Sequence, residues 1–205
     1  MMKEYQPWSD EWRKEITFVP WLQSDREDMQ EAPVLPLYPI FVAGLEKNVE
    51  GEAFWQAVSG AMTYLLGHEP DHPLANLYVR WLSIYNPDLA ERLMIDGTLA
   101  ASQYDVATAI WMLQAALLLN PYLIEANYNL GLAFCQLGEA LQKENCQDQA
   151  QSSYQQAYRY LSNTIELDHT LSTAYYTLGV VCRRLNKPEE SKAYLEKAIV
   201  LDLAK

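Results

Sequence analysis

A fixed spacing between helix-ending tripeptides constrains this chain more than any other feature. Each tripeptide has Asn or Asp at its centre, and the four are Tyr85-Asn86-Pro87, Leu119-Asn120-Pro121, Leu167-Asp168-His169 and Leu201-Asp202-Leu203. Their intervals are 34, 48 and 34 residues, so the middle interval is one 34-residue period with a 14-residue insertion. Gly97, Gly131 and Gly179 keep the same spacing. This period predicts helix-turn-helix units that bury their apolar faces only by stacking on one another.

The residues within each period follow one pattern. The last unit carries Tyr175, Leu178, Gly179 and Cys182, then Ser191, Leu195 and Ala198. The unit before it carries Asn127, Leu130, Gly131 and Phe134, with Ala157 and Leu161 after the insertion. An earlier unit carries Leu93, Asp96, Gly97 and Ala100, then Ala109, Leu113, Ala116 and Pro121. The pattern resembles the tetratricopeptide repeat family, in which W-x2-L-G-x2-Y precedes A-x3-F and a closing Pro. The resemblance covers residues 88–202, and the departures from it are Asp96, His169, Ser191 and Leu203.

We therefore expect an all-α fold, a right-handed α-solenoid of stacked antiparallel helix pairs with an irregular N-terminal segment. Gly131 and Gly179 let the two helices of a pair approach closely, and Pro87 and Pro121 end helices because proline cannot continue one. The sequence shows no strand-like alternation of apolar and polar residues. No sheet is therefore expected.

The chain divides into five sections. They are an irregular proline-containing segment at 1–50 that packs on the repeats, a degenerate helical pair at 51–87, a degenerate repeat at 88–121, a repeat with the insertion at 122–170 and a repeat at 171–205. In the second section, apolar residues at helical spacing stop at Gly67-His68-Glu69-Pro70-Asp71-His72-Pro73, which we interpret as a loop. Residues 74–85 form the next helix.

Residues 33–42 are apolar and spaced by prolines, which favours an extended, polyproline-like conformation. An apolar run of this size is not left in water in a stable monomer. We therefore expect this segment to pack against the repeats and to cap or partly fill their groove.

The 14-residue insertion lies in a stretch without Gly or Pro, residues 139–170. Fourteen residues are about four helical turns, or about two for each helix of the pair. We expect longer helices around residues 138–160, as a protruding hairpin with its tip near Asn145–Asp148. The insertion is then either plain elaboration or a contact arm for a partner.

Composition and charge exclude several classes of protein. Acids outnumber bases by 27 to 15, and residues 51–120 contain only Arg80 and Arg92 as bases, so a nucleic-acid partner is not expected. The start of the chain lacks an apolar signal core, and no stretch is long and apolar enough to span a bilayer. We expect a cytoplasmic protein without a membrane partner, in which Cys135, Cys146 and Cys182 are reduced.

No group of residues predicts chemistry. His68 and His72 lie near Glu69 and Asp71, but Pro70 and Pro73 prevent the helical geometry that would align two imidazoles on a metal. No phosphate-binding glycine loop and no nucleophile signature is present. We expect neither a cofactor nor a metal, and no enzyme. An enzyme whose site lies in the N-terminal 85 residues stays open as an alternative.

The resemblance implies an interaction module. In tetratricopeptide proteins the first helix of each pair lines a concave groove that holds a partner peptide. Motif position places the following residues in that groove: Met94, Thr98, Glu125, Tyr128, Asn129, Leu132, Gln136, Tyr176, Val180, Arg183 and Arg184. Asn129 falls where chaperone-tail-binding members carry a clamp Asn, but Tyr128 and Leu132 supply no basic partner for acidic tails. A groove wall of apolar and aromatic side chains with Arg183 and Arg184 at one end suits an extended peptide with an apolar stretch. A self-assembling structural protein, its groove filled by its own N-terminal segment, is the alternative.

The last pair predicts self-association. It is followed by no polar capping helix of the kind that shields the end of a solenoid. The apolar residues of this pair that are not used internally then face outward; the candidates are Val181, Cys182, Leu185, Tyr194, Ala198 and Leu201. We expect a homodimer through this end. The basic residues around it, Arg183, Arg184, Lys187, Lys192 and Lys197, favour a monomer instead.

Overall fold

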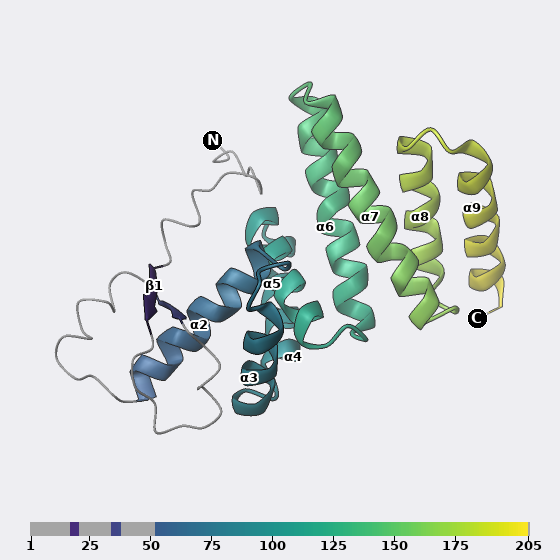
Figure 1. Ribbon diagram of the computed structural model, residues 1–205. Coiled ribbons are helices and arrows are strands. Elements are labelled where there is room, and N and C mark those ends of the chain that lie inside the picture. Colours follow the sequence, from purple (N-terminus) through teal and green to yellow (C-terminus); the bar gives the residue numbers. More distant parts are fainter. Residues whose placement is uncertain (1–16, 21–33, 38–51, 205) are drawn as a thin grey trace.

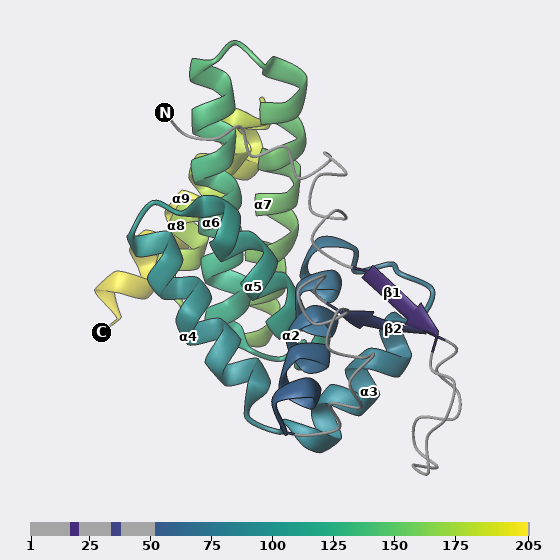
Figure 2. The same ribbon diagram turned by 90° about the vertical axis from the view of Figure 1, so that its left-hand side faces the viewer.

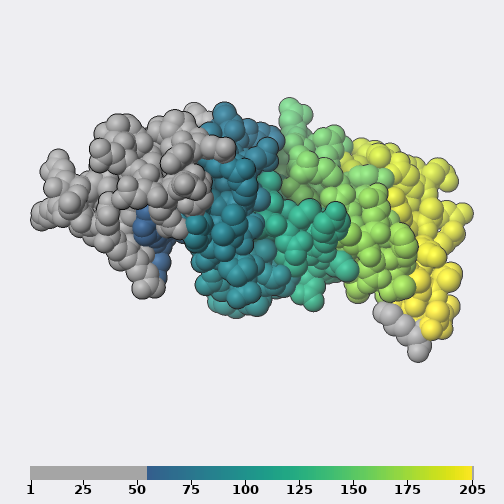
Figure 3. Space-filling view, turned by 60° about the horizontal axis from the view of Figure 1, so that its bottom comes forward, coloured from purple at the N-terminus to yellow at the C-terminus, as the bar shows by residue number. Residues whose placement is uncertain are grey.

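The computed structural model describes residues 17–20, 34–37 and 52–204. Within these ranges the helices are α2 (Glu52–His68), α3 (Ala75–Tyr85), α4 (Leu89–Ser102), α5 (Val106–Leu119), α6 (Ile124–Lys143), α7 (Gln147–Leu167), α8 (Ser172–Arg184) and α9 (Pro188–Leu203). The last six form the pairs α4–α5, α6–α7 and α8–α9, which stack in chain order (Figure 1). In the space-filling view the colours accordingly follow the sequence along the long axis of the molecule (Figure 3). The expected α-solenoid is confirmed.

Each pair has a close contact between a glycine on its first helix and a leucine on its second. The contacts join Gly97 to Leu113, Gly131 to Leu161 and Gly179 to Leu195. A Cβ atom on these glycines would lie 2.9, 2.6 and 2.6 Å from the leucine Cγ, which is too close without displacement. The repeated glycine is therefore a packing requirement, as the sequence predicts for Gly131 and Gly179.

The turns between the two helices of each pair share one geometry. Tyr104, Asn145 and Asn186 have φ values of 62°, 63° and 57°, in the left-handed region. In each turn, the residue that follows this left-handed position donates its N–H to the carbonyl oxygen five positions before itself. An example is the 2.9 Å bond from Cys146 N to Leu141 O. These three positions are evenly spaced along the sequence. The insertion is therefore shared equally between the helices before and after Asn145.

The inserted residues lengthen both helices of the second pair. Helices α6 and α7 have 20 and 21 residues, compared with 13 and 16 in α8 and α9. Their connecting end projects beyond the neighbouring pairs in both ribbon views (Figures 1 and 2). The predicted long hairpin is confirmed, with its turn at residues 144–146.

Helix α2 packs mainly against α5 rather than against α3, its neighbour in the sequence (Figure 2). Gly67 lies inside α2, where a Cβ atom would be 2.4 Å from the carbonyl oxygen of Trp111 on α5. The interpretation of Gly67 and His68 as loop residues is therefore wrong. Gly67 does not break the helix; its missing side chain allows the helix to approach the α5 backbone.

The expectation that the chain has no sheet is also wrong, although only locally. Two short strands, β1 (Thr17–Pro20) and β2 (Val34–Leu37), pair antiparallel, with Thr17 opposite Leu37 and Pro20 opposite Val34. Proline is tolerated because each strand of a two-stranded sheet has a free edge. Residues 34–37 are extended as predicted, but they form a β-ladder and lie against α2. Pro33 and residues 38–42 of the predicted segment lie outside the described residues.

The end of the stack at α8 and α9 exposes apolar side chains. Tyr176, Ile199 and Leu203 are 60%, 59% and 82% exposed. Of the six residues expected there, Val181, Cys182 and Ala198 are buried, and the other three, Leu185, Tyr194 and Leu201, are half-buried. Three of the six candidates are thus used internally, and the most exposed apolar side chains at this end are ones that the sequence analysis did not name.

A Gly179→Ala substitution tests the close contact in the last pair. Alanine is the better helix former, by about 1 kcal/mol. The added methyl group nevertheless meets Leu195 Cγ at 2.6 Å and the Ser191 carbonyl oxygen at 3.2 Å. We expect a net loss in the free energy of unfolding of about 1–2 kcal/mol, measured by urea denaturation. Thr177→Ala on the same helix is the control, and a stabilised Gly179→Ala variant would contradict the contact.

A Tyr104→Asn substitution tests the turn geometry. Tyr104 is 80% exposed, so its side chain contributes little packing. A left-handed backbone is strained for Tyr but tolerated by Asn, the residue that the other two turns use. We expect stabilisation by about 0.5–1 kcal/mol in urea unfolding. Gln103→Asn, where φ is −90°, is the control and should not stabilise. Equal effects at both positions would show that backbone strain at Tyr104 is not responsible.

Candidate functional site

The first helices of the three pairs, α4, α6 and α8, form one side of the stack. Neighbouring first helices contact one another more than neighbouring second helices do. The stack is therefore tighter on this side, as on the inner side of a curved solenoid. We call the surface of α4, α6 and α8 that carries the residues predicted for the groove the first-helix face.

A hydrogen bond joins two predicted groove residues from neighbouring helices. Asn129 Nδ2 on α6 donates to Thr98 Oγ1 on α4 over 2.8 Å. Thr98 in turn donates to the Met94 carbonyl within α4. Asn129 therefore fixes α6 against α4, and its amide nitrogen already has an acceptor. The bond also brings Asn129 and Thr98 together on one surface.

A second polar contact joins α8 to α6. Arg184 lies 3.4 Å from Glu139 Oε1, and its other guanidinium nitrogen lies 3.4 Å from Gln142 Oε1. Both ionic side chains are more than a third exposed, so this ion pair contributes little to stability. Sequence reasoning missed Glu139, because it follows the repeat motif rather than falling within it. Its carboxylate neutralises part of the positive charge expected at this end.

Cys135 lies between these charges and the core. Burial raises the pKa of its thiol to about 12; Glu139 adds to the shift and Arg184 opposes it. The thiol is therefore protonated at neutral pH. A protonated thiol is neither a nucleophile nor a good metal ligand, so Cys135 is a packing residue.

The predicted groove residues differ in exposure. Tyr128 is half-buried and packs against the main core cluster, whereas Tyr176 is 60% exposed. Met94, Leu132 and Val180 are half-buried, and Glu125, Gln136 and Arg183 are exposed. The accessible part of the first-helix face thus offers a tyrosine, partly covered apolar side chains and charges.

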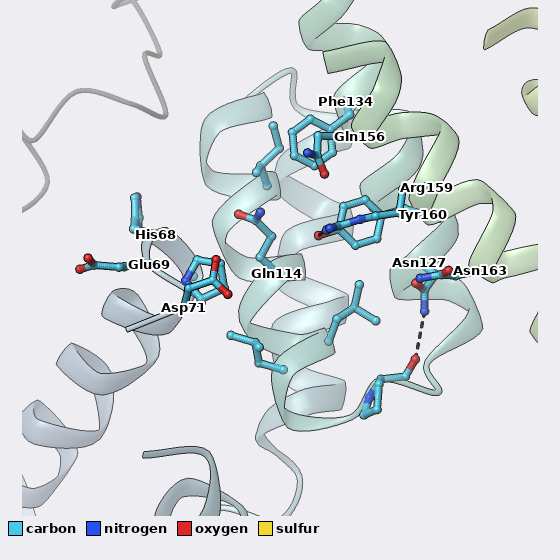
Figure 4. A pocket seen from close by; sticks show the side chains of 16 residues that line it. His68, Glu69, Asp71, Gln114, Asn127, Phe134, Gln156, Arg159, Tyr160 and Asn163 are labelled. Atoms are coloured by element: carbon cyan, nitrogen blue, oxygen red, sulfur yellow. Dashed lines mark hydrogen bonds between the residues drawn. The ribbon is translucent and has the colours of Figure 1, made fainter. Parts of the chain in front are cut away.

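A cavity of about 720 Å³ lies behind the stack, and no sequence pattern predicts it. Its walls come from the end of α2, the loop after it, and helices α5, α6 and α7 (Figure 4). We call it the rear cavity. Because its lining comes from segments far apart in the sequence, no local motif marks it.

The histidines considered as metal ligands have structural contacts instead. His68 Nδ1 lies 2.9 Å from the Tyr64 carbonyl oxygen, and its ring stacks on Trp111 with centroids 5.8 Å apart. His72 Nδ1 accepts a hydrogen bond from the Leu74 N–H over 3.2 Å. Within residues 52–204, no group of three His, Cys, Asp or Glu side chains is arranged to hold a metal ion.

None of the described helices is both long and apolar enough to cross a bilayer.

The comparisons with known proteins concern the repeats. The tetratricopeptide repeat profile matches residues 122–202. No curated protein matches the sequence.

Two solved structures are similar in shape. A crystal structure titled MamA protein is 21% identical, with a TM-score of 0.48 and coverage of 79% of this chain and 89% of the other. A second crystal structure of MamA is 22% identical, with a TM-score of 0.46 and coverage of 78% and 95%. The repeat pattern and the profile match agree: residues 122–202 match the tetratricopeptide repeat family.

Proposed function

We propose that the protein is a non-catalytic scaffold or assembly factor whose first-helix face binds an extended peptide segment of a partner protein. Tetratricopeptide repeats, which this chain carries at residues 122–202, typically serve in protein interaction rather than catalysis. The Asn129–Thr98 hydrogen bond is the observation that supports the proposal most, because it joins residues of two repeats into one continuous surface. A peptide lying across this bond would contact α4 and α6 together.

The chemistry of the first-helix face favours an extended peptide with an apolar stretch. Leu132 and Val180 are half-buried and offer shallow apolar contacts. Tyr176 and Arg183 are exposed, and these two residue types are enriched among the strongest contacts at protein interfaces. Acidic tails are disfavoured, because Glu139 lies beside Arg184 and one of the two Asn129 N–H donors is already bonded to Thr98.

A second candidate function is self-association through the end of the stack. Tyr176 and Ile199 line a shallow cavity of about 330 Å³ between α8 and α9, and both are exposed. A second copy of the chain placed there would bury them, and a twofold contact is the commonest closed arrangement.

Capture of partner proteins from a cell extract tests the peptide-binding proposal. We expect Tyr176→Ala combined with Arg183→Ala to weaken retention of the captured proteins at least about tenfold, because such side chains often dominate binding energy. Tyr122→Ala is the matched control, since Tyr122 is 76% exposed on the loop before α6. Retention would be measured by quantitative mass spectrometry. Equal retention by all variants would contradict binding at the first-helix face.

Light scattering tests self-association. We expect a mass that rises with concentration above the 23.5 kDa of one chain, and a return to one chain when Ile199 and Leu203 are both replaced by Lys. Ile95→Lys serves as the control because Ile95 is 60% exposed on α4. A mass of one chain for the unmodified protein at high micromolar concentration would exclude the contact.

A further inference from the structure

A pocket of about 650 Å³ lies among α2, α3, α4 and α5, which are grouped at the start of the stack (Figures 1 and 2). Its volume falls within the roughly 300–1,000 Å³ typical of ligand pockets. None of its described lining residues lines the rear cavity or belongs to the first-helix face. We call it the tryptophan pocket, because its large aromatic side chains are Trp55 of α2, Trp81 and Tyr85 of α3, and Trp111 of α5.

The aromatic rings of the pocket form one continuous surface. The centre of the Trp81 ring lies 5.9 Å from that of Trp55 and 4.9 Å from that of Tyr85. Tyr85 is 41% exposed and Trp81 only 5%, so this surface runs from solvent into the interior. On α5, Trp111 is held by ring contact with Tyr64, with centroids 5.2 Å apart. Aromatic surfaces of this kind bind flat aromatic groups in stacked or edge-to-face arrangements.

Contacts between the surrounding helices hold the walls in place. Asn86 Nδ2 donates to Ser59 Oγ over 2.9 Å, which joins the end of α3 to α2. Gly67 brings α2 against the α5 backbone at Trp111, and Leu93 of α4 is buried beneath the pocket lining that it helps to form. The pocket is therefore preformed by the packing of the helices.

Trp81 carries a buried hydrogen-bond donor that has no acceptor. Its indole Nε1 is out of contact with solvent and makes no hydrogen bond within the part of the chain that the structure describes. A buried tryptophan N–H usually has a partner, because an unpaired buried donor is costly. Since Trp81 lines the pocket, a ligand that brings an acceptor can satisfy this donor.

The polar groups of the pocket narrow the class of ligand. Tryptophan rings attract cations, but the Trp81 N–H and the Arg92 guanidinium in the lining are both donors, which disfavours a cation. Residues 51–120 contain seven acids and two bases, which disfavours an anion. Among apolar aromatic side chains that a partner protein could insert, those of Phe and Trp have no acceptor. A neutral aromatic ring with an acceptor nitrogen or a carbonyl oxygen meets these requirements.

We propose that the tryptophan pocket binds a small, neutral heteroaromatic molecule. Its ring packs against the aromatic surface of Trp55, Trp81 and Tyr85, and its acceptor atom receives the hydrogen bond from Trp81 Nε1. This site is separate from the first-helix face, so the protein holds this small molecule and a partner peptide at the same time.

Solution NMR of the indole N–H groups tests the proposal. The chain has six tryptophans, and the signal of Trp81 is the one that disappears in Trp81→Phe. The probes are indole and benzimidazole, which share a fused-ring shape and one ring N–H; only benzimidazole has a ring nitrogen acceptor. The pH is mildly alkaline, so that benzimidazole is neutral. We expect benzimidazole to move the Trp81 N–H signal downfield, as a new hydrogen bond does, and indole not to do so.

Titrations with the same two probes compare affinities. Benzimidazole should bind the unmodified protein at least about tenfold more tightly than indole, because only benzimidazole satisfies the buried donor. Trp81→Phe keeps an aromatic ring without the donor and should lose this preference. Tyr85→Ala should weaken both probes by about threefold or more through lost ring contact. Tyr122→Ala, on the exposed loop before α6, is the control and should change neither affinity. Thermal unfolding verifies that each variant folds.

Several results would overturn the proposal. If neither probe binds, water rather than a ligand satisfies the Trp81 donor. Equal affinities of the unmodified protein for the two probes, or no downfield movement of the Trp81 signal, would show that the donor does not select the ligand; this comparison decides even if Trp81→Phe does not fold. A benzimidazole preference that persists in Trp81→Phe would place the bound probe elsewhere. Tighter binding of N-acetyltyrosinamide than of benzimidazole would assign the pocket to a tyrosine of a partner protein instead.

Discussion

The close contact between a glycine and a leucine in each helix pair is the constraint on which the stack depends. It occurs three times, at Gly97, Gly131 and Gly179, with the same geometry. Ala157 is fully buried beside the Gly131–Leu161 contact. Tyr160 and Leu137 belong to a core cluster with residues from all three pairs. A repeat is therefore completed only by its neighbour.

A second close contact gives the molecule its rear surface. Gly67 brings α2 against α5 at Trp111, so α2 and α3 do not continue the stack as a further repeat. Their core is largely separate, built around Tyr78, Met62 and Leu65, and it joins α5 through Leu118 and Leu119. Residues 52–204 thus form a regular stack and a helical unit docked on its second-helix side. The first-helix face and the rear cavity result from these two parts.

The sequence predicted the features that depend on local spacing. The glycine positions, the helix ends at Asn120 and Asp168, and the long hairpin around Asn145 all follow from contacts between residues that recur at a fixed period. Features that depend on contacts between distant segments were missed. Gly67 followed by a proline-rich stretch has the pattern of a loop, and only its contact with Trp111 shows why it lies in a helix. The pairing of Thr17–Pro20 with Val34–Leu37 joins short segments in which prolines hide the strand pattern.

A double-mutant cycle on Gly131 and Leu161 tests the glycine–leucine contact most directly. Leu161 is fully buried, so Leu161→Ala alone should cost about 2–5 kcal/mol, and Gly131→Ala alone about 1–3 kcal/mol through the clash with Leu161 Cγ. With both changes, the new methyl group occupies space that the leucine has left. Urea unfolding of the four proteins should then show the double variant to be more stable than the sum of the single effects predicts, by at least about 1 kcal/mol. Additivity within about 0.5 kcal/mol would mean that the two side chains do not compete for the same space, and would contradict the contact as the basis of the stack.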